Sequence, residues 1–180
     1  MIRTRRDNWI AAGLEALRSE GSSALTIDRL AITLGRTKGS FYHHFPDLDS
    51  FHSAVLAWWR EHMTTGIIRE TEAEPSVPRR RARLSALVSQ LDVKLELAVR
   101  AWGLTDDRAR QAVAEVDQLR MAHLENLWKG EGHARGARLL ARLEYAAFLG
   151  AQQMYPSLSS HSARTLEAAL IRALSALATD

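Results

Sequence analysis

One stretch decides the fold of this chain: Thr26-Ile27-Asp28-Arg29-Leu30-Ala31-Ile32-Thr33-Leu34-Gly35-Arg36-Thr37-Lys38-Gly39-Ser40-Phe41-Tyr42-His43-His44-Phe45. Its apolar residues recur at the spacing of a helix face, and Thr26 and Thr37 are residue types that cap helix starts. Gly35 suits the left-handed position that ends a helix, so only Gly35 and Arg36 separate the two helices. Because so short a turn forces the second helix to leave at a steep angle, the stretch predicts a helix-turn-helix motif.

The residues on either side of this motif also follow helical periodicity, and strand-like alternation is absent from the sequence. We predict further helices over 4–20, 47–72, 79–104, 106–130, 134–155 and 162–178. Pro46 ends the short helix that begins after Thr37, and Asp47 can cap the next one. The sequence therefore predicts an all-α protein, with an N-terminal three-helix unit over residues 1–46 and a helical bundle over residues 47–180.

Composition excludes several classes of protein. The 180 residues include no cysteine, which rules out disulfide bonds, thiol nucleophiles and cysteine-ligated zinc. The most apolar long stretch, Leu139 to Tyr155, contains Arg142 and Glu144, so we predict no membrane span and a cytoplasmic location. Residues 1–46 hold seven Lys or Arg and four Asp or Glu, whereas the rest of the chain holds seventeen of each kind. The excess positive charge thus lies in the N-terminal unit, where a polyanion would be attracted.

The short helix after Thr37 carries residue types suited to DNA. Lys38 can donate to guanine or to a phosphate, and Thr37 can bind a phosphate at the helix start. Gly39 and Ser40 are small enough for a DNA backbone to approach closely, and Tyr42 can reach bases, sugars or phosphates. This helix is therefore the candidate for insertion into the major groove.

Neither a metal nor a cofactor is predicted. His43 and His44 are neighbours in sequence, and neighbouring residues on a helix point about 100° apart, so the two rings cannot easily hold one ion. The Gly-Ser order after Lys38 does not match the Gly-Lys-Ser/Thr order of a phosphate-binding loop, which also needs a preceding strand.

Taken together, Leu25-Thr26-Ile27, Leu30-Ala31 and the run from Leu34 to Pro46 closely resemble the tetracycline-repressor (TetR/AcrR-like) family of transcriptional regulators. The resemblance covers nearly all of the first 60 residues. It implies a homodimer with two N-terminal DNA-binding units and a variable C-terminal domain that binds a small-molecule inducer and dimerises. The DNA-binding residues that it implies are Thr26, Ile27, Arg36, Thr37, Lys38, Gly39, Ser40, Tyr42, His43 and His44, with Arg3, Arg5 and Arg6 as a basic arm.

One position departs from the family pattern. Many relatives carry a lysine that contacts a phosphate just inside the fourth helix, whereas this chain has Asp47-Leu48-Asp49 there. We therefore expect that contact to be missing and the basic arm and Arg36 to take more of the phosphate load.

The C-terminal region offers candidates for two further sites. Aromatic and polar residues that could line a small-molecule cavity are Trp58, His62, Trp102, His123, Trp128, Tyr145, Phe148 and Gln152. Apolar residues of the last two helices that could pack against a second copy are Leu140, Tyr145, Leu149, Leu166, Leu170 and Leu174.

The function predicted from these features is that of a sequence-specific transcriptional regulator. It would be a homodimeric repressor that binds a palindromic double-stranded DNA operator and is released by an unidentified small-molecule inducer. Three alternatives are a transcriptional activator of the same architecture, a helical enzyme acting on a small molecule, and a non-specific architectural DNA binder. Against the enzyme, the sequence shows no nucleophile elbow, metal-ligand spacing or nucleotide loop. Against the architectural protein, a non-specific DNA binder would need more net charge than +3.

Overall fold

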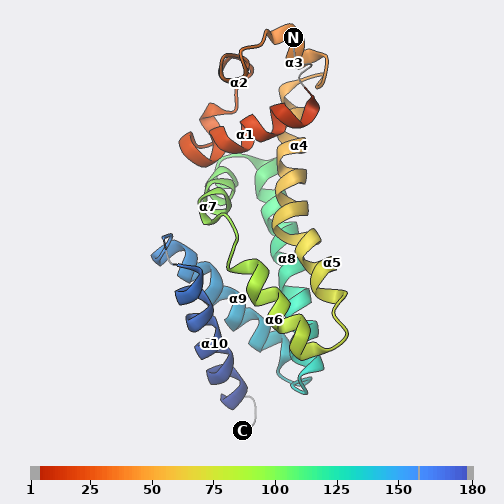
Figure 1. Cartoon of the computed structure of the whole chain (residues 1–180), viewed down its shortest axis with the longest axis vertical. Coiled ribbons are helices and arrows are strands. Elements are labelled where there is room, and N and C mark those ends of the chain that lie inside the picture. Colours follow the sequence, from red (N-terminus) through yellow and green to blue (C-terminus); the bar gives the residue numbers. More distant parts are fainter. Residues whose placement is uncertain (1–4, 158, 178–180) are drawn as a thin grey trace. The chain divides into compact units, whose positions relative to one another are not determined.

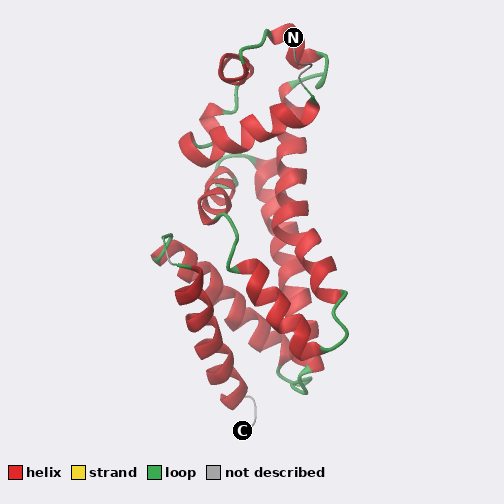
Figure 2. Ribbon diagram, in the orientation of Figure 1, coloured by secondary structure: helices red, strands yellow, loops and turns green. Residues whose placement is uncertain are grey.

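A computed structural model describes residues 5–157 and 159–177 of the chain. The regular elements in these residues are helical, as Figure 2 shows, and the all-α prediction is confirmed. The helices, labelled in Figure 1, are α1 (Arg6–Glu20), α2 (Ile27–Leu34), α3 (Lys38–Tyr42), α4 (Leu48–Arg60), α5 (Gly66–Glu72), α6 (Val77–Val88), α7 (Val93–Trp102), α8 (Asp107–Gly130), α9 (Ala137–Met154) and α10 (Ser160–Leu177). A 3-10 turn, η1 (Ser22–Ala24), follows α1, and a π-helical turn, η2 (Glu61–Thr65), joins α4 to α5.

The chain divides into two compact units by packing. The first unit contains Met1–Glu61 and Lys94–Ala114, and the second contains His62–Val93 and Glu115–Asp180. The first unit thus includes α7 and the start of α8, which come from the middle of the sequence. The functional division predicted near residue 46 stays a prediction.

The predicted helix over 79–104 is wrong, because the structure breaks it into α6 and α7 at residues 89–92. The Ser89 hydroxyl donates to the carbonyl of Ala86 at 3.0 Å, a local bond of the kind by which serine competes with helix continuation. Two turn bonds follow, from Gln90 N to Leu87 O and from Leu91 N to Val88 O. The break assigns α6 to the second unit and α7 to the first.

The core of the first unit is a cluster of four aromatic rings. These rings belong to Trp9 of α1, Phe41 of α3, Phe51 of α4 and Phe45, which lies between α3 and α4, and each residue is at most 1% exposed. Their ring centroids lie 5.1 to 5.5 Å apart, at mostly edge-to-face angles that favour aromatic pairs. Because Phe41 and Phe45 are one turn apart, the cluster fixes which side of α3 faces the core.

In the second unit, α10 packs against α9 and α6, and α5 packs against α6. The core is apolar around Trp128, with Leu127, Ala137 and Ala141 also buried. Among the described residues, no helix combines the length and the apolar character needed to cross a bilayer.

A close approach of α1 and α4 depends on Gly13. A Cβ atom there would lie 2.5 Å from Phe51 Cζ and 3.3 Å from Val55 Cγ2. The Phe51 ring cannot retreat easily, since Phe41 and Phe45 pack against it.

We therefore predict that Gly13→Ala lowers the free energy of unfolding by about 1 to 3 kcal/mol, the usual cost of overpacking a core. Gly39→Ala is the matched control, because a Cβ atom at Gly39 meets Thr37 Oγ1 at an ordinary 3.7 Å. Urea denaturation of both variants measures the effect, and equal stability of the two variants would contradict this account of the α1 and α4 contact.

Candidate functional site

Both helices of the helix-turn-helix are capped as their sequences predict. The side-chain oxygen of Thr26 accepts from the N–H of Arg29 at 3.3 Å, and that of Thr37 accepts from the N–H of Ser40 at 3.3 Å. Gly35 adopts a left-handed conformation with φ 60°, and the N–H of Arg36 then reaches the carbonyl of Ala31 at 2.8 Å. These bonds define where α2 ends and where α3 begins.

One side of the motif is buried. Leu30, Ala31, Phe41 and Phe45 are buried, whereas Leu34 is only partly buried. These buried residues form the inner side of the motif, and the opposite side of α3 is open.

That open side, which we call the α3 edge, consists of Thr37, Lys38, Gly39, Ser40, Tyr42, His43 and His44. Tyr42 is 54% exposed although it is large and aromatic, and its ring stands edge-on to Phe41 at 5.6 Å. Ser40 and His44 are half-buried, and the other members of the edge are exposed. The predicted DNA-binding residues in and beside α3 are thus all at least partly accessible.

The remaining predicted DNA-binding residues lie around this edge. Thr26 is exposed at the start of α2, while Ile27 and Arg36 are half-buried. Arg5 and Arg6 are exposed, and the guanidinium of Arg6 lies 4.8 Å from the centre of the Phe45 ring. Arg3 lies outside the described residues.

Gly39 has no internal reason to be glycine. The nearest atom to a Cβ added there is Thr37 Oγ1 at 3.7 Å, and its φ is not positive. Glycine within a helix costs about 0.5 to 1 kcal/mol relative to alanine. A requirement for close approach by something outside the protein would explain this residue.

Lys38 is held by an acidic neighbour on α2. Its Nζ lies 2.7 Å from Asp28 Oδ1, and both side chains are largely exposed. The hydrogen bond to Asp28 raises the pKa of Lys38 above its ordinary value. The Lys38 ammonium is therefore charged and oriented. To bind a phosphate, it has to break its ion pair with Asp28 or contact both groups at once.

The start of α4 carries acids where the family pattern has a lysine. Asp47 caps the helix by accepting from the N–H of Ser50 at 2.7 Å, and this backbone bond holds the pKa of Asp47 below its ordinary value. Asp49 Oδ1 pairs with Nη2 of Arg108 at 3.1 Å. Sequence reasoning missed Arg108, because it lies 59 residues further along the chain.

Glu96, also missed, is buried in the first unit. Its carboxylate is fully buried and accepts from Trp59 Nε1 at 3.2 Å and from Arg100 Nε at 2.9 Å.

The ring centroid of Trp102 lies 5.1 Å from that of His52, and His52 Nε2 lies 3.1 Å from the carbonyl oxygen of Leu25. Trp102, a predicted ligand residue, thus has a structural contact in the first unit, to which the half-buried Trp58 also belongs.

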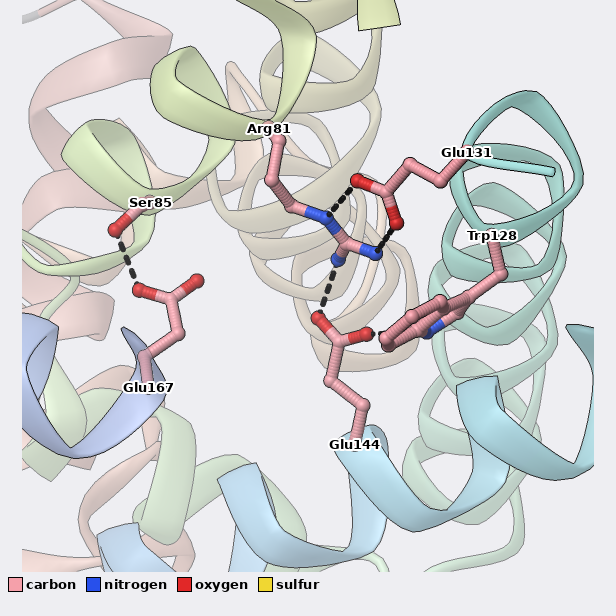
Figure 3. A network of polar contacts seen from close by, with 6 residues as sticks. All are labelled: Arg81, Ser85, Trp128, Glu131, Glu144 and Glu167. Carbon is pink, nitrogen blue, oxygen red and sulfur yellow. Dashed lines mark hydrogen bonds and ion pairs between the residues drawn. The ribbon is translucent and has the colours of Figure 1, made fainter. Parts of the chain in front are cut away.

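The second unit contains a partly buried ion-pair network that the sequence did not reveal. Figure 3 shows Arg81 of α6 between two carboxylates: Glu131 accepts two hydrogen bonds at 3.0 Å, and Glu144 accepts one at 2.7 Å. The other oxygen of Glu144 accepts from Trp128 Nε1 at 2.7 Å. Burial raises the pKa of Glu144 above its ordinary value despite the attraction of Arg81. Trp128, a predicted ligand residue, therefore serves this network.

The same view contains a third carboxylate, Glu167, which links α10 to α6. The Ser85 hydroxyl donates to Glu167 Oε2, and burial raises the pKa of Glu167. Glu167 thus ties the last helix to the interior of the second unit.

Two of the predicted ligand residues are buried with unsatisfied polar atoms. His123 is 6% exposed, and no described residue hydrogen-bonds to either ring nitrogen; Glu72 Oε1 is 3.7 Å from Nδ1, beyond hydrogen-bond range. Burial lowers the pKa of His123, which favours the neutral ring. Gln152 is 7% exposed, and its Oε1 likewise has no partner among the described residues. Such atoms cost free energy unless water or a ligand satisfies them.

The other predicted ligand residues of the second unit differ in accessibility. Tyr145 is buried and stacks on the partly buried Phe148, with centroids 6.0 Å apart, while His62 is exposed.

The predicted dimer residues need a correction. Leu140, Tyr145 and Leu174 are each 5% exposed and belong to the core of their own unit, so they have little surface left for a partner. Leu149 and Leu170 are partly buried, and only Leu166 of the predicted set is largely exposed. The exposed large apolar residues that sequence reasoning missed on α9 are Leu139, Leu143 and Met154.

The raised pKa of Glu167 predicts a pH dependence of stability. A carboxyl whose pKa is higher in the folded than in the unfolded state loses stability as pH rises through the window between the two values. Glu167→Gln keeps an oxygen for Ser85 and removes that loss, so its stability relative to the parent should be greater at neutral pH than at acidic pH.

Glu125→Gln is the control with the opposite sign, since hydrogen bonding to Lys129 lowers the pKa of Glu125. Urea denaturation at both pH values measures the two variants. A Glu167→Gln variant that loses relative stability as pH rises would contradict the assignment.

Comparison with solved structures places this architecture among known proteins. A protein described as a transcriptional regulator from Pseudomonas aeruginosa PAO1 aligns with a TM-score of 0.75 and 16% identity, covering 96% of this chain and 90% of that chain. A TetR-family transcriptional regulator from Rhodococcus sp. aligns with a TM-score of 0.74 and 20% identity, covering 94% and 97%. FadR from Bacillus subtilis, solved in complex with stearoyl-CoA, aligns with a TM-score of 0.69 and 13% identity, covering 94% and 97%.

No family model and no curated protein matches the sequence. At identities this low, the likeness establishes the fold alone. The chain therefore has the fold of the TetR/AcrR-family transcriptional regulators along nearly its whole length.

Proposed function

We propose that this chain is a sequence-specific DNA-binding transcriptional regulator of the cytoplasm, a homodimeric repressor that a small molecule releases from its operator. The α3 edge carries the proposal. It joins an exposed tyrosine, a charged lysine and a glycine with no internal role on one side of a rigidly capped helix. Surfaces of this composition fit the major groove, where small residues allow close approach and polar ones reach bases and phosphates.

In this mechanism α3 enters the major groove, while Thr37 and the exposed Arg5 contact phosphates. Tyr42 and His43 face the base edges or the sugars. Two copies related by a twofold axis would read half-sites about 34 Å apart, which requires a palindromic operator. The ion pair with Asp28 would orient Lys38 in the free protein and would be exchanged for DNA on binding.

A second copy of this chain is the partner that fits the outer sides of α9 and α10. On α9 the exposed Leu139, Leu143 and Met154 accompany the small residues Ala146 and Ala147. On α10 the exposed Leu166, Ala169 and Ala173 follow the same helical spacing. Exposed apolar faces with small residues favour close helix packing, and two copies would form a four-helix interface.

The inducer would bind in the second unit. His123 and Gln152 support this part of the proposal, because their buried polar atoms lack partners and a ligand could satisfy them. The aromatic pair of Tyr145 and Phe148 would supply apolar contact. FadR was solved with stearoyl-CoA, but the ligand chemistry of this chain follows from its own side chains. An activator would use the same DNA and ligand contacts and would differ in its effect on transcription.

Two substitutions in the α3 edge test the DNA contact. Tyr42→Ala and Gly39→Ala should each weaken binding about tenfold, the scale of one lost base contact, because the first removes a contact and the second adds a Cβ atom at the interface. A mobility-shift titration with the DNA upstream of the gene measures the affinities, and Leu104→Ala, at an exposed leucine of the first unit, is the control.

The stability of the same variants separates a lost contact from misfolding. Gly39→Ala should unfold at the same or a higher urea concentration than the parent, since alanine favours helix over glycine. Unchanged DNA binding by both variants would argue against the α3 edge as the binding surface.

Leu143→Arg tests the dimer. Leu143 is 45% exposed, so the substitution should leave each protomer folded while placing a charge in the interface, and light scattering should then report a monomer. Leu104→Arg, at a leucine that is 81% exposed outside α9 and α10, should leave the dimer intact. Dimerisation of Leu143→Arg with the affinity of the parent would exclude this face.

A further inference from the structure

The negative charge of Asp28 lies beside the surface that the proposed function assigns to DNA. Asp28 is largely exposed on α2, and its Oδ1 lies 2.7 Å from Nζ of Lys38, which is largely exposed on α3. Both residues belong to the first unit, in which α2 packs against α3. A carboxylate at this place is repelled by DNA phosphates unless the DNA also offers it a hydrogen-bond donor.

The partner of Asp28 sets it apart from other acids of the first unit. Three of these acids pair with arginines outside the α3 edge: Glu15 with Arg18, Glu20 with Arg29, and Asp49 with Arg108. Asp28 instead pairs with a member of the edge. The helix dipole favours an acid in the first turn of α2, but it does not require a lysine on α3 to face that acid. Exposed ion pairs also contribute little to stability, so the pair is better explained by what the edge binds.

The major-groove edge of a G·C base pair complements these two side chains. Guanine presents two adjacent acceptors, N7 and O6, and the cytosine beside it presents the N4 donor. The ammonium of Lys38 can only donate and the ionised carboxylate of Asp28 can only accept, so each side chain matches one of the two bases. In an A·T pair the N6 donor lies between the N7 and O4 acceptors, so an ammonium finds no two adjacent acceptors there. The order of donors and acceptors therefore favours G·C.

We propose that Asp28 is a specificity-determining residue, which accepts from cytosine N4 while Lys38 donates to N7 and O6 of the guanine in the same base pair. This inference rests on the proposed function and specifies one base pair in each half-site. On binding, the bond between Lys38 and Asp28 is exchanged for bonds to the two bases, so neither charge is left without a partner. Since the acceptor comes from α2 and the donor from α3, the two strands are not equivalent, and a C·G pair in the reverse orientation is disfavoured as well.

The experiment uses the full chain and the double-stranded DNA that the parent protein selects from a randomised pool. Mobility-shift titration measures the affinity for the selected DNA and for duplexes in which one base pair at a time is replaced. The parent should bind about tenfold less tightly when the G·C pair at one position of a half-site becomes A·T or C·G. Asp28→Ala should lose most of this preference and keep the preferences of the parent at the other positions.

Asp49→Ala is the matched control. Asp49 is the second residue of α4 as Asp28 is of α2, and it is likewise an exposed acid paired with a basic side chain. Removing either acid reduces the repulsion from phosphates, which raises the affinity for every sequence alike. Asp28→Ala should in addition change the base preference at the one position, whereas Asp49→Ala should leave the preference of the parent unchanged at every position.

Asp28→Asn gives a second test at the same position. An amide side chain matches N6 and N7 of adenine, so this variant should shift the preference at the one position from G·C towards A·T. It also replaces Asp28→Ala if that variant does not fold.

A variant at position 28 that keeps the base preference of the parent at every position would overturn the inference. Selected DNA without a G·C preference in its half-sites would overturn it too. Failure of the parent protein to select any DNA sequence would instead refute the proposed function itself.

Discussion

The structure depends on the burial of Phe41 and Phe45 against Trp9 and Phe51. Helix α3 has five residues, far fewer than an isolated helix needs to be stable in water. Its orientation therefore comes from the aromatic cluster below it and from the caps at its ends. Because the cluster takes one side of α3, the other side is left with small and polar residues, and the α3 edge is a consequence of the packing.

Local chemistry made the helix-turn-helix predictable. Thr26, Thr37 and Asp47 cap helices through short-range bonds, and Gly35 ends α2 in the one conformation that favours glycine. What the sequence could not reveal were contacts between distant residues. Arg108, on another helix, forms an ion pair with Asp49. The turn η2 contains no glycine or proline from which an irregular turn could have been predicted. The break after α6 also lacks these residues, which is why one helix was predicted where there are two.

The second unit shows a different limit of sequence patterns. Helix α9 is apolar on two sides, so periodicity alone could not separate the buried Leu140 from the exposed Leu139 and Leu143. The interior of the second unit also contains charged residues, which a single sequence would assign to the surface. Glu144 is buried and its partner Arg81 is partly buried, so removing Arg81 would leave the Glu144 carboxylate without its counter-charge, which makes the network a strong constraint on how α6, α8 and α9 fit together. His123 lies outside this network, and its ring nitrogens have no hydrogen-bond partner among the residues that the structure describes.

Selection of DNA from a randomised double-stranded pool by the full chain tests the central claim most directly. The account predicts enrichment of a palindrome whose half-sites lie about one helical turn apart, with binding that weakens steeply as salt increases. Affinity for the enriched sequence should fall about tenfold when Tyr42 is replaced by alanine and stay unchanged when Leu104 is replaced by alanine. A pool that remains random after repeated selection by a folded, dimeric protein would contradict the assignment of the α3 edge to DNA.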